Sequence, residues 1–79
     1  MKRLGWEIVE DKISPSGDAS AALFRKRVVN NTVYRFVSWK GSEKDSEKHL
    51  YSTDDAFNAL EAWEVKVGIL PASYNPKLI

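Results

Sequence analysis

Residues 23–39, LFRKRVVNNTVYRFVSW, contain the clearest signal for β structure in the chain. Two runs rich in β-branched and aromatic side chains flank Asn30 and Asn31, and asparagine tolerates the positive φ angles that tight hairpin turns require. The stretch therefore predicts two antiparallel strands joined by a short turn. Its charged side chains are all basic, because no acid occurs between Ala19 and Gly41.

Two registers are open to this hairpin. A two-residue loop at Asn30 and Asn31 would place Lys26 opposite Arg35, which is a destabilising pair of like charges. A three-residue loop that includes Thr32 separates apolar from charged side chains better, and we expect this register. One face then carries Phe24, Lys26, Val28, Tyr34 and Phe36, and the other carries Arg25, Arg27, Arg35, Val37 and Trp39.

The segments on either side of the hairpin give weaker patterns. Residues 6–10, WEIVE, can form a short strand or a helical turn, and we expect a strand because Trp, Ile and Val favour pleated surfaces. Residues 14–18, SPSGD, are typical of a loop. Residues 41–48, GSEKDSEK, contain no apolar residue and predict a flexible exposed loop before a third strand at residues 49–51.

A helix is predicted from about Thr53 to Val67. Residues 52–55, STDD, supply an N-cap and two carboxylates at the positive end of the helix dipole. Gly68 occupies the position of a C′ glycine, Ile69 can make the accompanying apolar contact, and Pro71 prevents continuation. The apolar stripe has spacings of four, three and four residues and consists of Ala56, Leu60, Trp63 and Val67, widened by Phe57.

Together these elements predict one small α+β domain spanning residues 1–79. A chain of 79 residues and 9.0 kDa has room for a single domain. We expect a three-stranded antiparallel sheet with the helix packed on one face. The tail from residue 71 to 79 should be irregular, with Leu70 or Tyr74 packed across a sheet edge. The expected core consists of Phe57, Leu60 and Trp63 from the helix and Phe24, Val28, Tyr34 and Phe36 from the sheet.

The composition of the chain indicates in which cellular compartment the protein acts. The chain has no cysteine, and its longest apolar runs are far shorter than the roughly 20 residues that span a bilayer. Residues 1–7 carry two positive charges but no apolar segment of the kind found in secretory signals. We therefore expect a soluble cytoplasmic protein.

Few residues are suited to catalysis or metal binding. His49 is the single histidine, and a lone histidine is usually a surface or strand-edge residue. Among the acids of the helix, Asp54 and Asp55 are explained by the helix start, and Glu61 and Glu64 by exposure to solvent. No phosphate-binding loop or nucleophile motif occurs. We expect a protein that is not an enzyme and has no cofactor or metal.

The two halves of the chain differ in charge. Residues 1–40 have eight basic and four acidic side chains, and residues 41–79 have four basic and seven acidic ones. An exposed hairpin face with three arginines and a tryptophan offers hydrogen-bond donors and a stacking surface for double-stranded DNA. The expected contacts are Arg25, Arg27, Arg35, Trp39 and Lys40. An equally weighted interpretation is that these arginines only keep a sheet face solvated or pair with the acidic helix.

The order of elements resembles that of the AP2-like DNA-binding fold and of the related arm-binding domains of tyrosine integrases. The most similar stretch is residues 51–63, YSTDDAFNALEAW, which resembles the family's strand exit into an alanine-rich, acid-capped helix. The resemblance covers about residues 23–75. It implies DNA contacts by Arg25, Arg27, Arg35 and Trp39, although Leu50 stands where the family has glycine.

A second functional hypothesis is a small protein-binding adaptor or inhibitor, of the kind that phages encode. It would bind through an exposed sheet face or an edge strand. Trp6, Trp39 and Trp63 are more large aromatics than so small a core readily buries, and an exposed tryptophan is a common interface anchor. The oligomeric state stays open between a monomer and an edge-paired dimer.

Overall fold

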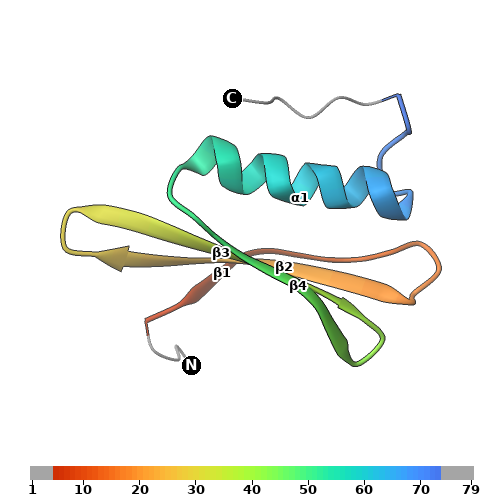
Figure 1. Ribbon diagram of the computed structural model, residues 1–79, viewed down its shortest axis with the longest axis horizontal. Helices are drawn as coiled ribbons and strands as arrows, with labels where there is room; N and C mark the ends of the chain where they lie inside the picture. The colour runs from red at the N-terminus through yellow and green to blue at the C-terminus, as the bar shows by residue number, and fades with distance from the viewer. Residues whose placement is uncertain (1–4, 74–79) are drawn as a thin grey trace.

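The computed structural model describes residues 5–73, which form a four-stranded antiparallel sheet with one helix along one face (Figure 1). The helix α1 (Thr53–Val67) contacts β2, β3 and β4. The α+β architecture is as expected, but the sheet has four strands instead of three. They lie side by side in chain order and are β1 (Glu7–Ile13), β2 (Ala19–Val28), β3 (Asn31–Lys40) and β4 (Glu43–Leu50).

Most of β4 lies in the segment predicted to be a flexible loop, residues 41–48, so that prediction is wrong, and only residues 49 and 50 of β4 belong to the strand predicted at residues 49–51. Gly41 and Ser42 form a tight turn, and β4 pairs with β3 from Glu43 onward. Charged residues dominate β4, which therefore gains little from burial and depends on its pairing with β3. The hydroxyl groups of Ser38 and Ser46, for example, lie 2.8 Å apart across the two strands.

The predicted first strand is confirmed and is longer than expected, since β1 continues to Ile13. Its pairing with β2 is interrupted by a bulge between Ile8 and Glu10, and Val9 packs against the core. The predicted loop at residues 14–18 is also confirmed. It is closed by a hydrogen bond of 2.8 Å from the Ser14 N–H to the Ala19 carbonyl.

The β2–β3 hairpin has a different register from the expected one. Its turn consists of residues 29 and 30, and Val28 pairs with Asn31. Lys26 consequently lies opposite Val33, so the like-charge pair that argued against a two-residue loop does not arise. The turn is shifted by one residue toward the N-terminus from the asparagine pair.

This register changes which side chains face the helix. Leu23 pairs with Phe36, and both point toward α1. Phe24 pairs with Arg35 on the opposite face. The expectation that Phe24 and Val28 belong to the core is therefore wrong, because alternation along β2 directs them away from the helix.

The core lies between α1 and the helix-facing side of the sheet. The predicted contributions of Tyr34, Phe36, Leu60 and Trp63 are confirmed, and Phe57 packs at the edge of the cluster. The buried apolar cluster consists of Ala21, Leu23, Tyr34, Phe36, Ala56, Leu60 and Trp63.

The bounds predicted for the helix agree with those of α1. The Ser52 hydroxyl accepts a hydrogen bond of 3.1 Å from the Asp55 N–H, which satisfies a free donor of the first turn. Gly68 ends the helix with φ 90°, a left-handed conformation that favours glycine. The Tyr34 hydroxyl lies 2.9 Å from the Thr53 Oγ1 and ties the helix start to β3.

One helix residue differs from expectation. Glu64 was predicted to be solvated, but it is buried, with 7% of its surface exposed. Its carboxylate lies 3.4 Å from the Lys12 Nζ, and this ion pair connects α1 to β1. Leu70 is half-buried and Tyr74 lies outside the described residues. No helix within residues 5–73 has the length and apolar character needed to cross a membrane.

Replacing Leu23 by alanine should lower the free energy of unfolding by about 2 to 5 kcal/mol, because it opens a cavity in a fully buried position. Val29 is 97% exposed in the hairpin turn, and Val29→Ala should change stability by less than about 0.5 kcal/mol. Urea unfolding followed by circular dichroism measures both values. Equal losses in the two variants would contradict the observed register.

Candidate interaction surface

The five residues predicted to bind DNA do not share a face. Arg25, Arg27 and Lys40 are each an even number of positions from a core residue of the same strand, so they project on the side of the sheet that carries α1. Arg35 and Trp39 project on the opposite side. The expected face of three arginines and a tryptophan is therefore not formed.

Two of these arginines are paired with acids. Arg25 Nε lies 3.2 Å from Glu7 Oε1, and this contact raises the pKa of Arg25. Arg35 forms a hydrogen-bonded ion pair with Glu47. Sequence reasoning placed Glu47 in a loop, so its pairing with a strand arginine was missed. Within residues 5–73, Arg27 and Lys40 make no ion pair.

The side of the sheet away from α1 is left uncovered by any described helix or strand (Figure 1). We call it the open face. Many of its side chains are apolar, and two of the largest, Ile8 and Ile13, are 60% and 69% exposed. The residues that the strand pairing places on it are Ile8, Asp11, Ile13, Ser20, Ala22, Phe24, Lys26, Val28, Asn31, Val33, Arg35, Val37, Trp39, Lys44, Glu47 and His49.

The bulge in β1 brings both isoleucines to the open face. Ile13 pairs with Ser20, and Ile8 pairs with Phe24, although the positions of the two isoleucines differ by an odd number. In a regular strand such residues point to opposite sides. The extra residue at the bulge changes the alternation, so both side chains face solvent.

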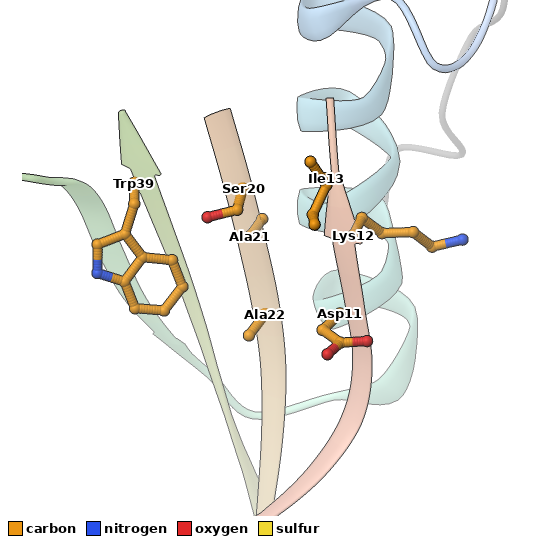
Figure 2. A pocket seen from close by; sticks show the side chains of 7 residues that line it. All are labelled: Asp11, Lys12, Ile13, Ser20, Ala21, Ala22 and Trp39. Atoms are coloured by element: carbon orange, nitrogen blue, oxygen red, sulfur yellow. The ribbon is translucent and has the colours of Figure 1, made fainter. Parts of the chain in front are cut away.

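A hollow of about 570 Å³ lies at one end of the open face (Figure 2). Ser20 and Ala22 of β2 form its floor, because their side chains are small. Asp11 and Ile13 of β1 stand on one side, and the Trp39 indole of β3 stands on the other. Lys12 also borders the hollow, but Figure 2 shows its side chain pointing toward the helix side.

Aromatic and basic groups gather at the other end of the open face. The Lys26 Nζ lies 5.7 Å from the centre of the Trp6 ring, which is within the range of a cation–π contact. The rings of Trp6 and His49 are 6.4 Å apart. His49 is exposed, as predicted for a surface residue. The Arg35 guanidinium lies 5.7 Å from the centre of the Phe24 ring.

The sequence contained a signal for the hollow that depends on register. Residues 19–22, ASAA, are small, but their significance emerges only when β2 is aligned so that Ser20 pairs with Trp39. With the expected three-residue loop, the Trp39 side chain would project from the opposite face to Ser20 and Ala22. The hollow would then lack the wall that Trp39 forms. The residues of β1 that complete it follow a bulge that no local motif predicted.

A second hollow, of about 260 Å³, lies on the helix side near the hairpin turn. Arg25, Arg27, Thr32 and Tyr34 line it together with Glu7. The carboxylate of Glu7 neutralises the charge of Arg25, so only part of the positive charge of the two arginines remains. Within residues 5–73, no cluster of three or more potential metal ligands occurs.

Comparisons with protein-family models, with curated proteins and with solved structures find no match for this chain. The resemblance to AP2-like domains therefore stays a prediction.

The ion pairs at Glu47 predict an acid-sensitive contact. Hydrogen bonds from Lys44 and Arg35 lower the pKa of Glu47 from 4.5 to about 2. Because the folded-state pKa is depressed, the stabilisation is present above the ordinary pKa and is lost as the pH falls through about 2. Carboxyl NMR titration should give a midpoint near 2, and Lys44→Gln and Arg35→Gln should each raise it. An unchanged midpoint in both variants would disprove the pairing.

Proposed function

We propose that this chain is a non-enzymatic protein-binding module and that the open face is its contact surface. The observation that carries the proposal is that two exposed isoleucines, Ile8 and Ile13, share the open face, and that Ile13 borders a hollow walled by Trp39. Exposed apolar residues that are contiguous and rimmed by polar groups mark interaction sites on small proteins.

The chemistry of the open face fits protein recognition better than phosphate recognition. Its charged groups are of both signs, since Asp11 and Glu47 accompany Lys26, Arg35 and Lys44. The acids would repel a nucleic-acid backbone, whereas apolar area around an indole excludes water in the manner of interface hot spots. Paired charges such as Arg35 with Glu47 contribute to the polar rim.

A photo-crosslinking experiment tests the proposal even while the partner is unidentified. With p-benzoylphenylalanine in place of Ile13, irradiation of the cells that naturally produce the chain should yield a protein adduct of defined mass. The same probe in place of Ala62, an exposed residue of α1, is the control and should yield none. Absence of any adduct from Ile13, or equal adducts from both positions, would refute the open face as a contact surface.

DNA binding by the hairpin is a second candidate, supported by one feature of the sheet. The pairing of β1 with β2 ends at Glu7 with Arg25, and that of β4 with β3 ends at Tyr34 with Leu50. Residues 26–33 therefore extend beyond the sheet as a two-stranded ribbon, which carries Lys26 and Arg27 and no acid. A two-stranded ribbon fits the major groove of DNA.

Fluorescence anisotropy with a labelled duplex at two salt concentrations tests this candidate. If the ribbon contacts phosphates, binding should weaken with salt, and Arg27→Ala should reduce the logarithmic salt slope by about 0.9 for one lost contact. Arg35→Ala is the matched control, because Arg35 lies away from the ribbon tip and is paired with Glu47. Lack of binding at low salt would exclude the hairpin as a DNA-contacting element.

A further inference from the structure

We propose that the occupant of the open face is a second copy of this chain, packed face to face in a two-fold symmetric dimer. The inference rests on the proposed function, because it assigns the partner of the same surface. The two-fold axis would lie midway between the two sheets. It would pass over β2 at a point between Ala22 and Phe24. Each element then meets its own counterpart running in the opposite direction.

Charge on the open face is arranged for such pairing. Asp11 stands at the end with the hollow, and Lys26 stands at the aromatic end. Within the described residues neither takes part in an ion pair. Asp11 pairs with Ala22, which is four residues, or about 13 Å, from Lys26 along β2. The proposed axis places Lys26 of each copy over Ser20 of the other, one strand and two residues from Asp11, and the long lysine side chain reaches the carboxylate, so two equivalent ion pairs form.

The shape of the open face is complementary to itself under the same axis. Bulky side chains occur at one end, where Trp6 and Phe24 lie, and the hollow occurs at the other. Rotation places Phe24 over Ala22 of the second copy and directs the Trp6 ring toward the hollow beside Trp39. Glu47 likewise approaches His49 of the second copy, which avoids a contact between like charges.

The area of the open face is suitable for a dimer of this kind. Strands of up to ten residues are about 33 Å long, and four strands are about 19 Å wide, which gives a projected area on the order of 600 Å² per copy. Standard interfaces bury about 800 Å² of accessible surface per partner, and accessible surface exceeds projected area because side chains project. Sheets that pack face to face in this way are separated by about 10 Å.

The sheet edges are less suited to self-association. β4 carries a row of charges, among them Glu43, Lys44 and Lys48, and its pairing with β3 is interrupted after Ser38. The other edge strand, β1, contains the bulge between Ile8 and Glu10. Charged side chains and bulges are the usual features that prevent edge pairing. Self-association is therefore expected through the face.

Sedimentation equilibrium of the purified chain over a range of concentrations measures the dimer. We expect a mass of twice 9.0 kDa at high concentration. Ile13→Asp should raise the dissociation constant by about tenfold or more, since it places a charge in the apolar contact. Val29→Asp is the matched control, because Val29 is exposed at the hairpin turn and lies off the open face. It should leave the dissociation constant unchanged.

A charge exchange tests the orientation. Asp11→Lys and Lys26→Asp should each weaken the dimer by about tenfold, and the double variant should regain affinity to within about threefold of the original, because the pair is restored with opposite polarity. Circular dichroism verifies that each variant is folded. A dimer that tolerates Ile13→Asp, or a double variant no tighter than the single ones, would overturn the proposed arrangement.

The mass of the adduct from the Ile13 photo-crosslink separates this inference from the proposed function. An adduct of twice the chain mass supports the face-to-face dimer. An adduct of any other protein, with a monomeric purified chain, would overturn the dimer while supporting a protein-binding face. If Ile13 gives no protein adduct and the chain is monomeric, both proposals fail.

Discussion

The alignment of β2 with β3 is the constraint on which the rest of this structure depends. Because residues 29 and 30 alone form the turn, Leu23 lies beside Phe36, and the two side chains point toward the helix. A shift of one residue in either strand would move every side chain of that strand to the other face of the sheet. Its core side chains would then be exposed and its charged ones buried. The helix, the hollow and the distribution of arginines all follow from this single alignment.

Local signals accounted for the parts of the fold that were predictable from the sequence. The helix bounds agree because Ser52 and Gly68 act within one turn of the residues they cap. The hairpin register could not be derived in the same way, since the asparagine pair suggested a turn one residue later than the actual one. Ten cross-strand pairs and the packing of the helix outweigh the preference of a turn residue.

Most of the fourth strand, residues 43–48, was missed for a related reason. Residues 43–48 have no apolar alternation, because β4 is an edge strand whose outer side chains are solvated. What holds it is contact with β3, in particular the hydroxyl pair of Ser38 and Ser46 and the ion pair of Glu47. These are long-range contacts, so they become visible only in the assembled sheet. The same is true of the candidate site. The sequence identified several of its residues individually, but it did not predict on which face of the sheet each of them lies.

The bulge in β1 has an evolutionary consequence. Substitutions change the apolar surface one side chain at a time, but gain or loss of one residue near Val9 would reverse the side to which the preceding part of β1 points. Ile8 would then move to the helix side, while Ile13 would keep its place. Length variation at this position could therefore create or abolish a binding surface in one step, whereas the core beneath α1 would stay largely intact. Relatives that differ here by a single residue are expected to differ in partner more than in architecture.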